Sequence, residues 1–334
     1  FPADGLSPAA NGHIPLVVGL NLGFSQFISI GNQADVNAET ALEYWEDEED
    51  VKQILLYMES IQNPANFRRL ASRISKKKPV LALKAGRSAA GASAASSHTG
   101  SLAGADKAAD ALLRQSGVIR EFSLQKLFAT AKVFATSPIP KGDRVAIITN
   151  SGGPGIMATD AVCEYGMKMA QLSDETKAKL RSFLPSAASV KNPVDMIASA
   201  PIEHYKETLE TVIADEGVDM VMVIYLPFLG LKDTDVADAL MEIKARHPEK
   251  PVVGVFMTKN EFFSNLAEKK VNMPFFMYAE EAADGLMRLN QQRLWENRPE
   301  GAVPTYAVDR VRVDAIFQAA RSEGRLELTT RESI

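Results

Sequence analysis

The chain repeats one pattern twice, an apolar run, an amphipathic stretch and a second apolar run, and this repeat limits the folds open to it. The first copy has its runs at Ile54–Met58 and 79–83, and the second at Met220–Tyr225 and 251–256, with a helix expected over 236–246. Uninterrupted apolar runs joined by helices are typical of parallel strands buried on both faces. The repeat therefore predicts an α/β protein with two related, doubly wound parallel-sheet domains.

Length and charge narrow the class of protein further. The chain has 334 residues, of which 46% are hydrophobic and 24% charged, and this is enough for two buried cores. A formal net charge of −5 provides no basic surface for nucleic acid or for an anionic membrane. The one cysteine, Cys163, excludes an internal disulfide or a cysteine metal cluster, and no apolar run approaches the ~20 residues that span a bilayer. We expect a cytoplasmic protein that binds neither nucleic acid nor membrane.

Two prolines and a glycine in residues 137–142 interrupt the helical pattern that ends near Phe134. A new strand is expected at 145–149, directly after this break. The sequence therefore predicts one domain over residues 1–137 and a second over 138–300.

His98 lies in a run of small residues, 96–104, that ends where a helical pattern begins. Small side chains at Ser97, Thr99 and Gly100 allow backbone N–H groups to close around an anion, and the following helix would add the positive end of its dipole. Imidazole titrates near neutrality, so His98 could accept a phosphoryl group and release it again. The alternative is an ordinary surface or packed histidine. Because an all-small loop around one histidine has little packing value, we favour the phosphate-handling role.

Residues 150–155, Asn-Ser-Gly-Gly-Pro-Gly, follow the strand at 145–149 and precede a helix expected over 156–165. A glycine-rich turn from a strand to a helix can bind phosphate or carboxylate, here through Ser151, Gly152 and Gly153. Glycines in such a turn also serve tight packing of the helix on the strand. Residues 192–195, Asn-Pro-Val-Asp, leave two interpretations open as well, turn capping or contact with a ligand, and capping is slightly favoured.

Glu59 directly follows the strand Ile54–Met58. Ligands gather at the carboxyl ends of parallel strands, so this carboxylate could accept the Nδ1 proton of His98 and leave Nε2 as the attacking atom. The alternative is a solvated acid at the end of a strand, and the residues alone do not separate the two.

The His98 loop, Glu59, the turn at 29–36 and the segments 150–155 and 192–195 together resemble one family, the NDP-forming acyl-CoA synthetases of the succinyl-CoA synthetase superfamily. The resemblance covers most of the chain. It implies two flavodoxin-like, doubly wound parallel-sheet domains, at 1–137 and 138–300. It also implies that residues 301–334 form a linker toward an ATP-grasp domain.

The resemblance further implies a reaction in which acyl-CoA, ADP and phosphate interconvert with acid, CoA and ATP, through an acyl phosphate and a phosphohistidine. By matching motif, His98 would be phosphorylated and Glu59 would orient it, while backbone N–H groups at Ser151, Gly152 and Gly153 would hold the phosphohistidine. CoA and ATP or ADP with Mg²⁺ would be bound mainly by domains outside this chain, so no metal ligands are expected in it.

The chain departs from this family at three places. We expect the CoA-binding domain to be absent, a segment to be missing near residues 18–19, and the chain to stop before an ATP-grasp domain. We therefore expect a portion of a larger enzyme, inactive alone and oligomeric in its assembly with CoA-binding and ATP-grasp domains or subunits. Its substrate would be a small carboxylic acid or acyl-CoA of unspecified acyl group, with ADP or GDP. The alternatives are a ligand-sensing module of a related GNAT protein acetyltransferase fusion, or a non-catalytic docking module.

Overall fold

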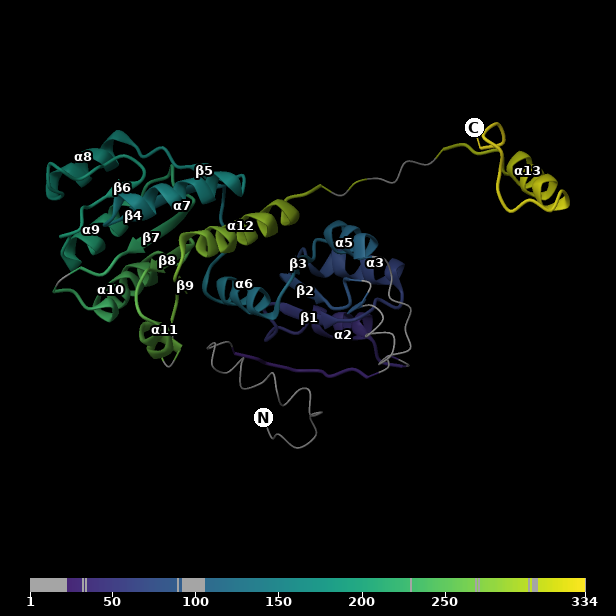
Figure 1. The fold of residues 1–334 in the computed structure, drawn as a ribbon, viewed down its shortest axis with the longest axis horizontal. Coiled ribbons are helices and arrows are strands. Elements are labelled where there is room, and N and C mark those ends of the chain that lie inside the picture. Colours follow the sequence, from purple (N-terminus) through teal and green to yellow (C-terminus); the bar gives the residue numbers. More distant parts are fainter. Residues whose placement is uncertain are drawn as a thin grey trace. The chain divides into compact units, whose positions relative to one another are not determined.

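The structure, a computed structural model, describes residues 23–31, 33, 35–88, 90–91, 106–228, 230–267, 269, 271–299, 301 and 306–333. Within them helices alternate with two separate parallel sheets of three and six strands (Figure 1). Two sheets, and not one continuous sheet, confirm the predicted α/β class with two domains. The segment near residues 18–19 lies outside the described residues.

The first sheet consists of β1 (Ile54–Met58), β2 (Val80–Lys84) and β3 (Ile119–Glu121), in that order and all parallel. Alternate residues of β2 enter two different cores: Val80 and Ala82 contribute to one, and Leu81 and Leu83 to the other. Four helices accompany these strands: α2 (Ala38–Glu46), α3 (Pro64–Ile74), α5 (Asp106–Gln115) and α6 (Leu124–Thr136).

The second sheet has the order β5-β4-β7-β8-β9, with the short strand β6 paired to β4 outside this path. Numbered from β4 along the chain without β6, this is the order 2-1-3-4-5 of flavodoxin-like folds. The six strands are β4 (Arg144–Thr149), β5 (Lys168–Met169), β6 (Val194–Asp195), β7 (Met220–Tyr225), β8 (Val252–Phe256) and β9 (Phe275–Phe276). The winding direction reverses between β4 and β7, so this is where a ligand crevice is expected.

Helices cover both faces of the second sheet, which is what its strand composition predicts. Val221 and Val223 of β7 belong to one core, while Met220 and Met222 of the same strand belong to the other. The helices around this sheet are α7 (Gly152–Glu164), α8 (Asp174–Phe183), α9 (Ile202–Ile213), α10 (Asp233–Arg246), α11 (Asn260–Ala267) and α12 (Ala279–Glu296). Burial on both faces leaves the ends of the strands as the place for polar chemistry.

The long helix α12 belongs to the second core and also contacts the first sheet. Nε of Arg288 lies 3.0 Å from Oε1 of Glu121, a fully buried carboxylate at the end of β3. Burial raises the pKa of Glu121, and the Arg288 guanidinium opposes that shift. One turn along α12, the amide of Gln292 donates to the carbonyl of Ser75 at 2.7 Å. A buried ion pair and a buried hydrogen bond therefore tie the two sheets into one compact unit, residues 1–297.

The predicted strands are confirmed with small shifts, and two helices begin earlier than expected. Helix α10 begins at Asp233 instead of residue 236. Helix α7 begins at Gly152 instead of residue 156, so the glycines form its first turn and not a loop before it. Glycine and proline suggested a loop, but proline is tolerated in the first turn of a helix because no N–H is needed there. The domain limits 1–137, 138–300 and 301–334 stay a prediction.

Residues 298–334 form a second unit by themselves. It contains helix α13 (Arg310–Ser322) and a short segment in which Arg325 pairs with Glu332 at 2.9 Å. In the described parts of the chain, no helix is both long enough and apolar enough to span a membrane.

Glu46 at the end of α2 provides a stability test of the first domain. Its side chain is 7% exposed and pairs with Arg73 and Lys77 of the neighbouring segment, which hold its pKa near 2 instead of 4.5. A carboxyl group whose pKa is lower in the folded than in the unfolded protein stabilises the fold at pH values above its unfolded pKa. This stabilisation is lost as the pH falls to the pKa of the group in the folded protein. Because both cations are half-exposed, solvent screening reduces the expected gain to about 1–2 kcal/mol.

Glu46→Gln should therefore lower the free energy of unfolding by about 1–2 kcal/mol at pH 7, and the difference should vanish near pH 2. Urea unfolding of both proteins at pH 7, 4 and 2.5 measures this. Equal stability of the two proteins at pH 7 would contradict the assignment.

Candidate functional site

The loops after β4 and β7 are held together at the point where the second sheet reverses direction. Asn150, the first residue after β4, is 3% exposed. Its side-chain amide donates to the carbonyl of Leu226 at 2.8 Å, and its side-chain oxygen accepts from the Leu226 N–H at 2.9 Å. This paired bond fixes both loops at the carboxyl edge of the sheet, where α/β proteins bind ligands.

The first turn of α7 has two backbone donors that no described group accepts. Ser151 is the N-cap of α7, and its side chain makes no capping hydrogen bond. The third helical residue, Pro154, has no N–H, which leaves the amides of Gly152 and Gly153 as the orphan donors of this turn. Both glycines are exposed. Two free N–H groups at the positive end of a helix dipole form a site for an anion.

The three glycines of this turn differ in the space around them. A Cβ added to Gly153 would meet nothing within 4 Å, and one added to Gly152 would lie 3.3 Å from Oδ2 of Asp195. A Cβ on Gly155 would lie only 3.1 Å from Cγ2 of Thr149. Gly155 is thus the glycine that permits close helix-to-strand packing, while Gly152 and Gly153 leave room for a ligand.

The polar side chains of the segment 192–195 bind backbone groups: Asn192 binds distant strands instead of capping its own turn, and Asp195 makes a local turn bond. The Asn192 side chain accepts from Ile147 N at 2.9 Å and donates to the carbonyls of Val145 at 2.8 Å and Ala170 at 3.0 Å. Oδ1 of Asp195 accepts from the N–H of Ile197 at 3.0 Å, in a turn where Ile197 has φ of 67°. This φ is uncommon for a β-branched residue, so the Asp195 bond stabilises an unfavourable backbone.

The carboxyl edge of the first sheet carries the predicted Glu59, which follows β1. Its Oε2 atom is buried and has no hydrogen-bond partner. A buried carboxylate oxygen without a donor costs stability, so this atom is available to a donor that binds there. The other residues predicted for this edge, His98, Ser97, Thr99 and Gly100, lie outside the described residues. Their proximity to Glu59 stays a prediction.

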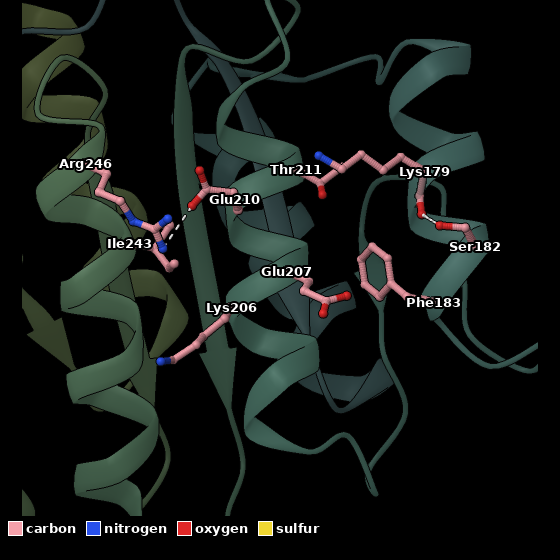
Figure 2. Close-up of a pocket in the computed structure, with 9 residues that line it drawn as sticks. All are labelled: Lys179, Ser182, Phe183, Lys206, Glu207, Glu210, Thr211, Ile243 and Arg246. Carbon is pink, nitrogen blue, oxygen red and sulfur yellow. Dashed lines mark hydrogen bonds and ion pairs between the residues drawn. The ribbon is translucent and has the colours of Figure 1, made fainter.

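A surface hollow of about 430 Å³ lies elsewhere, among α8, α9 and α10 (Figure 2). Figure 2 shows Phe183 from α8, Glu207 from α9 and Arg246 from α10 around it. Arg246 lies 3.3 Å from Oε2 of Glu210, so part of its charge is already neutralised. The lining residues of α8 and α10 come from their last turns, which lie away from the carboxyl edge of the sheet. None of the residues predicted for the site lines this hollow.

Sequence reasoning missed Asn150 as a functional residue and treated it as part of a glycine-rich turn. The signal available was its position, the first residue after a buried strand at the expected reversal point. A polar residue at such a position is a candidate for ordering a ligand crevice. Which loop it would bind could not be read from the sequence, because Leu226 is 76 residues away.

Comparison with known proteins agrees with this geometry. Residues 16–134 match the succinyl-CoA ligase like flavodoxin domain, and residues 145–283 match the Ligase-CoA domain. The alpha subunit of acetate–CoA ligase [ADP-forming] II from Pyrococcus furiosus is 42% identical over 277 residues, covering 81% of this chain and 60% of that protein. The 4-hydroxybutyrate–CoA ligase [ADP-forming] of Nitrosopumilus maritimus is 32% identical over 316 residues, covering 93% of this chain and 45% of that protein.

A solved structure supports the fold comparison. Dinucleotide forming acetyl-coenzyme A synthetase 1 of Ca. Korarchaeum cryptofilum, in complex with phosphate and ADP, has a TM-score of 0.80 and 28% identity. The alignment covers 87% of this chain and 64% of that one. The chain thus spans between about two fifths and two thirds of the length of these relatives.

The two hydrogen bonds between Asn150 and Leu226 should contribute measurably to the free energy of unfolding. Asn150→Ala removes both partners of the Leu226 backbone, and because Leu226 is 38% exposed and water can partly replace them, we expect the free energy of unfolding to fall by about 1–2 kcal/mol. Chemical denaturation measures the loss, and amide hydrogen exchange at Leu226 should quicken in the same variant. Asn260→Ala, a change at the start of α11, is the control. Unchanged exchange at Leu226 would contradict a link between the two loops.

Proposed function

The chain is an alpha-subunit-like member of the NDP-forming acyl-CoA synthetases, and from this premise we propose that it bears the phosphorylated histidine of such an enzyme. The enzyme is an acid–thiol ligase that interconverts acyl-CoA, ADP and phosphate with acid, CoA and ATP. The observation that supports this best is the pair of unused N–H groups at Gly152 and Gly153, placed where the second sheet reverses direction.

The proposed reaction has three balanced steps. Phosphate attacks the acyl carbonyl of acyl-CoA, the C–S bond breaks, and CoA leaves as its thiol with acyl phosphate formed. Nε2 of His98 then attacks phosphorus, the P–O bond to the acyl group breaks, and the carboxylic acid leaves as its anion. The phosphoryl group finally moves from His98 to ADP, which gives ATP and restores the imidazole.

Each site residue has a distinct part in these steps. Glu59 accepts the Nδ1 proton of His98 in a hydrogen bond, which holds the ring and stabilises it when the phosphoryl group makes it cationic. The free Oε2 of Glu59 supports this role. Gly152 and Gly153 donate their N–H groups to phosphoryl oxygens. The predicted N–H of Ser151 is not free, because it donates to Oγ1 of Thr149 at 2.9 Å, so Ser151 is proposed to add its hydroxyl instead. Ser97, Thr99 and Gly100 are proposed to surround the phosphoryl group from the loop that holds His98.

CoA, ADP or ATP, and Mg²⁺ complete the proposal. We assign the nucleotide and its Mg²⁺ to an ATP-grasp domain or subunit, and CoA to a CoA-binding domain. The Mg²⁺ is proposed to be carried by the nucleotide phosphates. The alpha-subunit name of the Pyrococcus furiosus relative supports an assembly with such a partner.

Variants of His98 and Glu59 distinguish a loss of the reaction from a loss of the fold. In the assembled enzyme, His98→Ala should abolish ATP formation from acetyl-CoA, ADP and phosphate, because it removes the proposed acceptor, and the described histidines, His204 and His247, lie within or at the end of helices. Glu59→Gln should lower kcat by roughly 10- to 1,000-fold, because a neutral amide stabilises the cationic ring less. Circular dichroism checks the fold of both variants. Normal turnover by folded His98→Ala would contradict the proposed role of His98 as the phosphoryl acceptor.

Gly153 allows the backbone donor to be removed without a bulky change. Gly153→Pro removes the N–H at a helical position that tolerates proline, whereas Gly153→Ala keeps it, and the added Cβ meets nothing within 4 Å. We expect the proline variant to lose roughly 10- to 100-fold in phosphohistidine formation and the alanine variant to stay within about threefold of wild type. Rapid-quench assays measure both rates. Equal rates in the two variants would exclude this N–H as a phosphoryl ligand.

A further inference from the structure

Two opposite charges at neighbouring strand ends of the first sheet remain unpaired. Lys84 is the last residue of β2, and it lies in register with Met58, the last residue of β1. Glu59 follows Met58 directly. No ion pair joins Lys84 to Glu59, and Oε2 of Glu59 has no partner. Among the described residues, a buried ammonium and a buried carboxylate oxygen at this edge thus lack charged partners, and each is a candidate contact for a ligand.

Apolar packing alone does not explain why a lysine is buried at position 84. Its side chain is 3% exposed, so the ammonium does not reach solvent as most lysines do. Its one hydrogen bond is to the carbonyl of the next residue, Ala85, at 3.1 Å. By strand alternation Lys84 is on the same face as Val80 and Ala82, where a methionine would satisfy the packing. A buried ammonium with a single neutral partner is costly to the fold unless an anion binds it.

The other described cations at this edge are already engaged. Arg120 binds the carboxylates of Asp106 and Asp110. The guanidinium of Arg87 lies 5.1 Å from the centre of the Phe122 ring and is exposed to solvent. Nε of the buried Arg120 also lacks an acceptor, but among the described buried cations of this edge Lys84 is the one with no carboxylate partner.

We propose that Lys84 is a phosphoryl-binding residue, its ammonium holding an oxygen of the phosphoryl group that is transferred at the edge where Glu59 lies. The inference rests on the proposed function. A phosphorylated imidazole has both kinds of group that this edge can bind: its phosphoryl oxygens suit the donor Lys84, and its ring N–H suits the acceptor Glu59.

The role of Lys84 in the transfer is electrostatic. As the P–O bond of the acyl phosphate breaks and the P–N bond to the imidazole forms, negative charge stays on the three non-bridging oxygens. A fixed ammonium beside one of them stabilises phosphate, acyl phosphate and phosphohistidine alike, and no proton leaves the lysine. Loss of the ammonium should therefore appear in the KM for phosphate and in the phosphohistidine level, and not in the KM for acetyl-CoA.

The test uses the assembled enzyme with acetyl-CoA, ADP, Mg²⁺ and inorganic phosphate. Lys84→Met should raise the KM for phosphate roughly 10- to 100-fold and leave the KM for acetyl-CoA within about twofold of wild type. Its Tm should stay the same or rise, because an uncompensated buried charge has been replaced by an apolar chain of similar length. Lys84→Arg should recover part of the phosphate affinity.

Lys78→Met is the matched control, since Lys78 precedes the same strand at its opposite end and binds the carbonyls of Trp45 and Glu48. It should leave the KM for phosphate unchanged. Wild-type KM for phosphate in Lys84→Met, or an equal loss for both substrates with a lowered Tm, would overturn the role of Lys84 while leaving the proposed function intact. Failure of the proposed function is a separate result, recognised because wild-type enzyme would then form no phosphohistidine.

Discussion

Burial of both faces of each parallel sheet is the constraint on which this molecule depends. When helices cover both faces, the strands can carry only apolar side chains along their length, as Met220–Tyr225 does. Polar chemistry is then confined to the strand ends and to the helix termini beside them. The candidate groups follow this division closely: Glu59 and Lys84 end strands of the first sheet, and Gly152 and Gly153 begin a helix of the second.

The two edges are suited to different parts of one phosphoryl group. The first offers full charges, a carboxylate with a free oxygen and a buried ammonium. The second offers uncharged N–H donors from the first turn of α7, in a loop fixed by Asn150. A carboxylate and an ammonium can discriminate between ring and phosphoryl group, whereas backbone donors bind any anion that reaches them. The rigid contact of α12 with Glu121 keeps both sheets in one compact unit.

The sequence predicted the parts of this arrangement that local patterns determine. Apolar runs located the strands, and glycine with serine marked residues 151–153 as a candidate anion site, although the helix begins at Gly152 and so includes these glycines. Three features could not be read locally, because each joins residues far apart in the chain. Asn150 binds Leu226, Asn192 bridges β4 and the residue after β5, and Arg288 reaches Glu121. Lys84 was not predicted from the sequence for another reason. A lysine at the end of a strand is ordinarily solvated, and only the tertiary fold buries Lys84.

The central claim is that this chain carries a phosphoryl group on a histidine, and locating that group tests it most directly. The assembled enzyme would be incubated with γ-labelled ATP and Mg²⁺, digested at alkaline pH, and its labelled peptide sequenced by mass spectrometry. The account predicts label that is stable to base, labile to acid and located on His98, and that is removed when acetate and CoA are added. Label on another residue, or folded enzyme without label, would contradict it.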